Sequence, residues 1–173
     1  MRFVLFQPDI APNVGTILRL SACLDIPVDI IEPCGFPWDS KALRRATMDY
    51  ANPEIIFRHK SWEHYKNYFP QTGSVENIGQ TINNGITKAQ NPSQGRLILL
   101  TTKSTQPYFD FSFDPTDRIM VGRESGGVPE IIHNSADVRL NIPINPEYRS
   151  VNVAIALAIV AGEALKQTQL YPR

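Results

Sequence analysis

Short apolar segments that alternate with segments of helical periodicity constrain the fold of this chain more than any other feature. Several of these apolar segments are continuous, which is typical of strands buried on both faces of a mostly parallel sheet. The predicted strands are residues 2–6, 28–31, 54–57, 97–101, 118–121 and 138–142. The predicted helices are residues 13–24, 39–50, 61–69, 128–135 and 147–168. This alternation predicts a three-layer α/β fold with a mostly parallel sheet.

The length and composition fit one domain that spans residues 1–173 and has a core of its own. Lys and Arg together number 17, as do Asp and Glu, so the net charge is zero. A nucleic-acid partner would therefore have to meet basic residues concentrated on one face. The chain starts without the features of a signal peptide, and its most apolar segment, 150–165, is shorter than the about 20 residues of a membrane span. We therefore expect a cytoplasmic protein in which Cys23 and Cys34 are buried, reduced thiols.

The first and last predicted helices differ in how their apolar residues are distributed. In the first, Asn13 is the expected N-cap, and Arg19 falls nearly opposite an apolar stripe formed by Ile17, Leu20 and Leu24. On this pattern alone, Arg19 is better explained as part of a solvated face. In the last helix, apolar residues point in nearly every direction, as in a helix that is buried on all sides. Because the domain is small, we expect this helix to contribute to a subunit interface.

The common nucleotide-binding and metal-binding motifs are absent from the sequence. No GxGxxG follows the first predicted strand, and no GxxxxGK followed by Ser or Thr occurs in the chain. Their absence argues against a conventional Rossmann enzyme, which binds its cofactor through a phosphate cradle. GxSxG and HExxH are also missing, and His59, His64 and His133 do not cluster in the sequence, so no metal site is expected.

Two loops contain the residue types of a binding site. The first, residues 121–130 (VGRESGGVPE), follows a predicted strand and carries three glycines, which let the backbone come close to a ligand. It is equally well explained as a strand-to-helix turn whose glycines serve geometry alone. The second, residues 141–153 (NIPINPEYRSVNV), places Arg149, Ser150 and Asn152 at the start of the apolar last helix. These residues either cap that helix, for which Ser150 is suitable, or present polar groups to a ligand.

Three stretches of the sequence, in this order and at this spacing, carry a family resemblance. They are PNVGTILRLSACLDIPVDIIEPCGFPWDSKALRRATMDY, IMVGRESGGVPEI and NIPINPEYRSVNVAIALAIVAGEAL, with LILLTTK between the first two. The sequence closely resembles the SPOUT methyltransferases, within them the TrmH-like group, and most nearly its TrmL type. Enzymes of that type methylate the ribose 2′-hydroxyl of the wobble nucleotide in certain leucine tRNAs. The resemblance covers most of the chain.

The resemblance implies a fold, an assembly and a cofactor. The fold is Rossmann-like with a deep trefoil knot in its C-terminal part, and the assembly is a homodimer that packs through the knotted region. The implied enzyme is an S-adenosylmethionine-dependent tRNA 2′-O-methyltransferase that acts on the wobble cytidine or uridine of leucine tRNAs, with S-adenosylhomocysteine as its product and without a metal. By position, the implied cofactor contacts are Leu100, Gly122, Glu124, Ile142, Ser150 and Val151.

The resemblance also implies roles for basic residues. Arg19 falls on the catalytic arginine of the family, which reverses the solvated-face interpretation. Because a guanidinium stays protonated up to about pH 12, we expect it to orient an RNA phosphate or stabilise a developing alkoxide rather than act as a base. RNA contacts are expected at Lys41, Arg44, Arg45 and Arg149, while a solvated helix face is the alternative explanation for the first three. The alternatives are a 2′-O-methyltransferase for another tRNA or rRNA position and a non-catalytic RNA-binding protein that retains the knotted fold.

The sequence departs from the TrmL pattern in three places. The loop that reads GRESGG here is GPETRG in many TrmL proteins, and Gly162 replaces a tyrosine that is common near the end of the last helix. The polar stretch 71–95 is longer than usual and is expected to be a surface excursion. These departures leave the expected reaction class unchanged.

Overall fold

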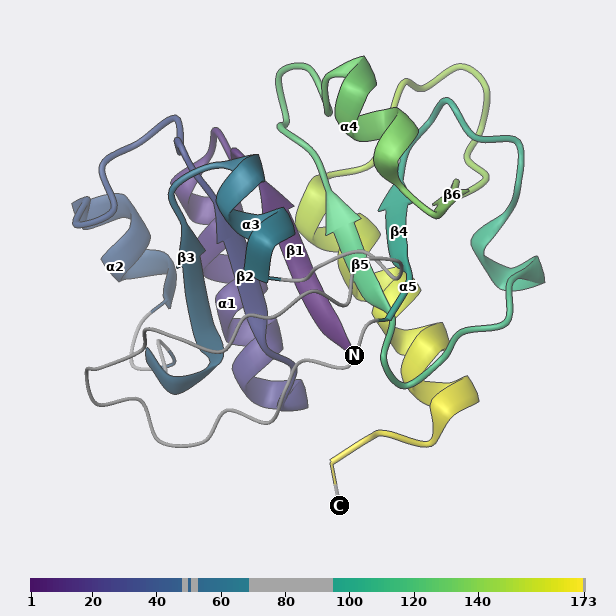
Figure 1. The fold of residues 1–173 in the computed structure, drawn as a ribbon, viewed down its shortest axis with the longest axis horizontal. Coiled ribbons are helices and arrows are strands. Elements are labelled where there is room, and N and C mark those ends of the chain that lie inside the picture. The colour runs from purple at the N-terminus through teal and green to yellow at the C-terminus, as the bar shows by residue number, and fades with distance from the viewer. Residues whose placement is uncertain (48–49, 51–52, 69–94, 173) are drawn as a thin grey trace.

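The computed structural model describes residues 1–47, 50, 53–68 and 95–172. Its strands form one sheet in the order β3-β2-β1-β5-β4-β6, and every neighbouring pair is parallel (Figure 1). The strands are β1 (Arg2–Phe6), β2 (Val28–Ile31), β3 (Ile56–His59), β4 (Leu97–Leu100), β5 (Arg118–Val121) and β6 (Val138–Leu140). The predicted α/β fold with a mostly parallel sheet is therefore confirmed, while the trefoil knot stays a prediction.

Helices cover both faces of the sheet (Figure 1). Phe3 and Leu5 of β1 lie in the apolar core formed with α1, α2 and α5. Val4 and Phe6 lie in the core on the other face, formed with α3 and α4. This alternation follows from the two-residue period of a strand and makes three layers. The helices are α1 (Ala11–Leu24), α2 (Lys41–Thr47), α3 (Trp62–Tyr68), α4 (Glu130–Ser135) and α5 (Val153–Thr168), with short 3-10 turns at Pro53–Ile55 and Tyr108–Asp110.

Two of the expected helix caps are wrong. Helix α1 begins before Asn13, with Ile10 at the N-cap and Pro12 in the first turn, where a missing N–H costs nothing. Helix α5 is capped by Asn152 rather than Ser150. The Asn152 side-chain oxygen accepts hydrogen bonds from the backbone N–H groups of Ala154 and Ile155. At α1 the expected cap, Asn13, lies inside the helix, and at α5 the actual cap is two residues after the expected one.

Other expectations from the sequence need correction or fall outside the described part of the chain. The predicted strand at 54–57 begins two residues later, because Pro53–Ile55 forms a 3-10 turn. Cys23 is exposed and Cys34 is half-buried, so the prediction of two buried thiols is wrong. The surface excursion predicted for residues 71–95 lies outside the described residues except for Gly95. None of the described helices is long and apolar enough to cross a membrane.

A buried charge cluster joins the first three strands. Asp29, in the middle of β2, has no exposed surface. Its carboxylate accepts two hydrogen bonds from the Arg2 guanidinium, at 2.7 and 3.1 Å, and lies 2.7 Å from Nε2 of the buried His59. A buried carboxylate is tolerated only when it is paired in this way. The cluster therefore fixes the register of the three strands relative to one another.

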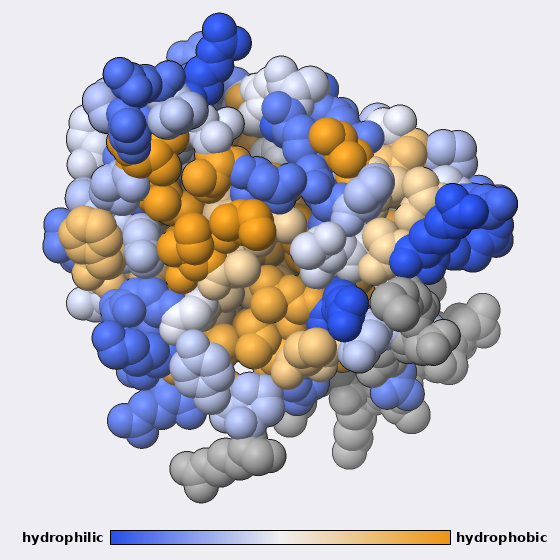
Figure 2. Space-filling view, turned by 180° about the vertical axis from the view of Figure 1, so that it is seen from behind, coloured by the Kyte–Doolittle hydropathy of each residue, from blue (hydrophilic) through white to orange (hydrophobic). Residues whose placement is uncertain are grey.

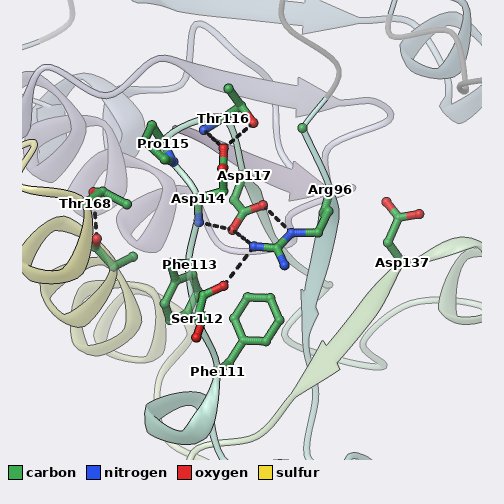
Figure 3. A network of polar contacts seen from close by, with 12 residues as sticks. Arg96, Phe111, Ser112, Phe113, Asp114, Pro115, Thr116, Asp117, Asp137 and Thr168 are labelled. Atoms are coloured by element: carbon green, nitrogen blue, oxygen red, sulfur yellow. Dashed lines mark hydrogen bonds and ion pairs between the residues drawn. The ribbon is translucent and has the colours of Figure 1, made fainter.

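A second polar network lies at the start of β4 and β5 (Figure 3). The Arg96 guanidinium donates two hydrogen bonds to the fully buried carboxylate of Asp117, at 2.9 and 2.7 Å, and a third to the Ser112 carbonyl oxygen. The Phe111 ring lies under the same guanidinium, with Arg96 Cζ 4.6 Å from the ring centroid. This network lies at the amino-terminal ends of the strands. The carboxyl-terminal ends are left for other contacts.

We expect Asp29→Ala to lower the free energy of unfolding by about 3–5 kcal/mol, because it removes the buried carboxylate that pairs with the partly buried Arg2 guanidinium and contacts the buried His59. The measurement is urea denaturation followed by circular dichroism. Glu63→Ala is the control, since Glu63 pairs with Lys66 at the surface with 71% of its side chain exposed, and exposed pairs contribute little. An equal loss of stability in the two variants would contradict this account of the buried cluster.

Candidate functional site

A cavity of about 540 Å³ opens at the carboxyl-terminal ends of β4, β5 and β6. In open parallel sheets, ligands bind outside this edge, close to the place where the strand order reverses. Here the order reverses between β1 and β5, and the cavity lies beside that point. Its volume is in the range that holds a small molecule or cofactor. Its walls come from the ends of the three strands, the start of α1, the loop after β5 and the segment that leads into α5.

The loop after β5, residues 122–127, is held in a tight turn. The backbone groups of Arg123 and Gly127 exchange two hydrogen bonds, at 2.9 and 2.8 Å. Gly127 has a positive φ of 64°, which favours glycine. A Cβ on Gly122 would lie 2.5 Å from the backbone carbon of Gly127, so a side chain cannot be accommodated there without a backbone shift. Gly122 and Gly127 are therefore required by the turn itself, and the turn places its backbone against the cavity.

The Glu124 carboxylate joins this loop to the start of α1. One oxygen accepts a hydrogen bond from the Asp9 backbone N–H and the other accepts one from the Asn13 side-chain amide, each at 2.8 Å. A negative charge is favoured beside the N-terminus of a helix. The return contact is made by Asp9, whose carboxylate accepts hydrogen bonds from the backbone N–H and hydroxyl of Ser125. These bonds hold the pKa of Asp9 below its ordinary value.

Asn13 connects this group of contacts to the last helix, α5. Its side-chain oxygen accepts a hydrogen bond from the Asn152 amide at 2.9 Å. Asn152 in turn caps α5 with its own side-chain oxygen. The side chains of Glu124, Asn13 and Asn152 thus form one continuous line of hydrogen bonds, and all three residues line the cavity.

The structure brings together seven of the residues that the resemblance singled out. All seven line the same cavity, although they are spread over four segments of the chain. They are Leu100, Gly122, Glu124, Ile142, Arg149, Ser150 and Val151. Their assignment to a cofactor or to RNA stays a prediction, while their convergence on one cavity is a property of the fold.

The other four predicted residues lie elsewhere. Arg19 is exposed on α1, as its position on the helical wheel predicted, and is not among the residues that line the cavity. Lys41, Arg44 and Arg45 are exposed on α2, which packs against α1. In the described part of the chain, the predicted site residues therefore form two groups: seven line the cavity, and four are exposed on α1 and α2.

Sequence reasoning missed Asp9 and Ser125, and it assigned Asn13 only a capping role. Asn13 and its partner Asn152 are 139 positions apart in the sequence, and Asp9 and its partner Ser125 are 116 positions apart. No local pattern indicates such contacts. One signal in the sequence could have pointed to Asn13 and Asn152. Each lies near the start of a helix, beside residues of the family motifs.

The comparison with known protein families decides the classification. The SpoU rRNA Methylase family matches residues 1–162. The chain belongs to this family. It is 46% identical over 163 residues to the tRNA (cytidine(34)-2'-O)-methyltransferase of Beijerinckia indica subsp. indica, with 94% of this chain and 89% of that protein covered. The resemblance to SPOUT methyltransferases of the TrmH-like group is thereby confirmed.

Two solved structures share the fold of this SpoU methylase. One, from work on 2-OH methylation of C/U34 on tRNA, has a TM-score of 0.78 at 28% identity, with 96% of this chain and 94% of that chain covered. The other is the SpoU methyltransferase AviRb from Streptomyces viridochromogenes in complex with AdoMet. It has a TM-score of 0.73 at 16% identity, and the match covers 96% of this chain and 57% of that chain. The likeness to AviRb shows the fold alone.

We expect Gly122→Ala to lower the free energy of unfolding by about 1–3 kcal/mol, because the new methyl group meets backbone atoms that cannot move aside. Gly126→Ala is the matched control in the same loop, since a Cβ there has no atom within 4 Å. Thermal and urea unfolding of the two variants measure the difference. If Gly126→Ala were as destabilised as Gly122→Ala, the close contact between Gly122 and Gly127 would not be what limits the loop.

Proposed function

We propose that this SpoU methylase is an S-adenosylmethionine-dependent tRNA 2′-O-methyltransferase that modifies nucleotide 34, the wobble cytidine or uridine, in leucine tRNAs. The observation that carries the proposal is 46% identity over 94% of the chain to a tRNA (cytidine(34)-2'-O)-methyltransferase. The motif residues that match the family's cofactor contacts also line one cavity of suitable size.

The residues of the cavity fit S-adenosylmethionine. Leu100, Ile142 and Val151 offer apolar walls, and the tight turn at residues 122–127 brings backbone close to the space. Within the described residues, Nε of Arg123 is buried without a hydrogen-bond partner, and Arg123 lines the cavity. A ligand with a hydrogen-bond acceptor would satisfy this donor. The described residues also contain no group of three or more potential metal ligands, and the proposal needs no metal.

When bound, the cofactor supplies an electrophilic methyl group on a sulfonium sulfur. The protein then has to place the ribose 2′-oxygen in line with that carbon and assist the loss of the hydroxyl proton. Negative charge develops on the 2′-oxygen as its proton leaves, and the cofactor's methyl group would be the acceptor for that oxygen's electron pair. The guanidinium of Arg19 supplies a fixed positive charge that stabilises this oxygen or orients the neighbouring phosphate.

The basic surface fits the backbone of the RNA. Lys41, Arg44 and Arg45 are exposed on α2, beside the helix that carries Arg19. Arg149 lines the cavity, and this position supports a contact between Arg149 and the nucleotide that enters. Phosphate contacts of this kind position an RNA without reading its sequence.

A homodimer completes the proposal. On the face that carries α1 and α5, hydrophobic residues gather in the middle and hydrophilic residues surround them (Figure 2). Ile155 and Ile159 of α5 are 52% and 37% exposed, and Ile10 is 43% exposed. The Tyr171 hydroxyl donates a hydrogen bond to the Gly162 carbonyl oxygen. Tyr171 follows α5 in the chain, and its ring therefore belongs to a residue that lies beside Gly162, where many TrmL proteins have a tyrosine. An apolar surface of this kind is typical of a subunit interface.

The proposed reaction is tested with methyl-labelled S-adenosylmethionine and bulk tRNA from a strain that lacks wobble 2′-O-methylation. We expect label on the ribose of nucleotide 34 of leucine tRNAs, mapped by nuclease digestion. Arg19→Lys is expected to lose most of the activity, because the planar guanidinium matters as well as the charge. Label at another position would keep the reaction class and overturn the assignment to nucleotide 34. Cofactor binding without label would point to ribosomal RNA.

The proposed dimer is tested with Ile155→Asp, which places a charge in the apolar face of α5. We expect this variant to sediment as a monomer in analytical ultracentrifugation, whereas the wild type sediments as a dimer. Ile131→Asp is the matched control, because Ile131 on α4 is 74% exposed and lies on the other side of the sheet. A wild-type monomer, or a dimer that survives in Ile155→Asp, would contradict this interface.

A further inference from the structure

The guanidinium of Arg19 lies over an aromatic ring. Its Cζ is 4.8 Å from the centroid of the Tyr50 ring. A cation within about 6 Å of the face of a tyrosine is attracted by the electron density of the ring. Arg19 is exposed, and its side chain has many rotamers to lose when it is held in one place. A ring at this distance restricts those rotamers before any RNA arrives.

The backbone of α2 places Tyr50. The Tyr50 N–H donates a hydrogen bond to the carbonyl oxygen of Thr47, the last residue of the helix, at 3.0 Å. Thr47 is buried, and its hydroxyl donates back to the Leu43 carbonyl oxygen at 3.1 Å. Leu43 is buried in the core between α2 and the sheet. The backbone of Tyr50 is therefore tied, through Thr47, to the packed end of α2.

The packing of α2 against α1 determines which side chain Tyr50 meets. A Cβ on Gly15 would lie 2.2 Å from Cβ of Ala46, so the two helices touch at this point without room for a side chain on α1. Gly15 and Arg19 are four residues apart and lie on the same face of α1, one turn apart. The face of α1 that carries Arg19 is therefore the face that α2 approaches.

We propose that Tyr50 is a positioning residue, which holds the Arg19 guanidinium against its ring so that the guanidinium meets the RNA in one orientation. The inference rests on the role of Arg19 in the proposed function and adds the residue that orients it. The ring performs this task through its face rather than its hydroxyl, because the contact joins the guanidinium to the ring centroid. The group that Arg19 then contacts is the ribose or the phosphate of the target nucleotide.

The test compares Tyr50→Leu with Tyr50→Phe in the same methyl-transfer assay. We expect Tyr50→Leu to lower kcat about fivefold, because the attraction to the ring face is lost. The KM for the cofactor is expected to stay within about twofold, since Tyr50 does not line the cavity. Tyr50→Phe is expected to retain kcat within about twofold, since it keeps the ring face. In an Arg19→Ala background, Tyr50→Leu is expected to have no further effect.

A second readout is independent of turnover. In the wild type, the side-chain protons of Arg19 are expected to be shifted upfield in the NMR spectrum by the ring current of Tyr50. Tyr50→Phe should keep this shift, and Tyr50→Leu should abolish it. Phe111→Leu is the matched control, because it removes a ring under Arg96, at 4.6 Å, at the opposite edge of the sheet. It should change neither kcat nor the Arg19 signals.

The outcomes distinguish a failure of the inference about Tyr50 from a failure of the proposed function. An active wild type together with an unchanged kcat in Tyr50→Leu would overturn the inference and leave the proposed function standing. Arg19 signals without an upfield shift in the wild type would do the same. A folded wild type that binds the cofactor and methylates no tRNA would overturn the proposed function, and the positioning role of Tyr50 with it.

Discussion

The two hydrogen bonds accepted by the Glu124 carboxylate are the contact on which the site depends. They tie the loop after β5 to the start of α1, and Asn13 passes the connection to the cap of α5. Without them, the two halves of the sheet would still pair through β1 and β5, and the Asp9–Ser125 contacts would still hold the loop near the start of α1, but the connection through Asn13 to α5 would be lost. One carboxylate beside a helix N-terminus thus helps to set the shape of the cavity at this end of the sheet.

Much of the fold follows from patterns within short windows of the sequence. Three of the six strands, at 2–6, 28–31 and 118–121, have the predicted bounds, because continuous apolar runs mark strands buried on both faces. The helix starts were harder to predict, because capping depends on which of several polar residues meets the first turn. Asn13 and Ser150 have the right chemistry for a cap, but Asn13 is used for tertiary contacts and Ser150 lies at the cavity.

The candidate site could be predicted only through the family motifs. Gly122 and Ser150 stand in recognisable strings, whereas the contacts of Asp9 with Ser125, and of Asn13 with Asn152, join parts of the chain that no local pattern relates. The sequence predicted only part of the placement of Arg19. Its exposure followed from the helical wheel, while the ring of Tyr50 beside it depends on how closely α1 and α2 approach each other at Gly15 and Ala46.

The link between Asn13 and Asn152 also sets an order of events during synthesis of the chain. The two residues are 139 positions apart. At about 5–20 residues per second, a ribosome needs on the order of 10 s to pass from one to the other. Throughout that interval, Asn13 lacks the partner that caps α5, and the cavity has only part of its wall. The nascent chain therefore cannot complete the wall of this cavity until the segment that carries Asn152 has been made.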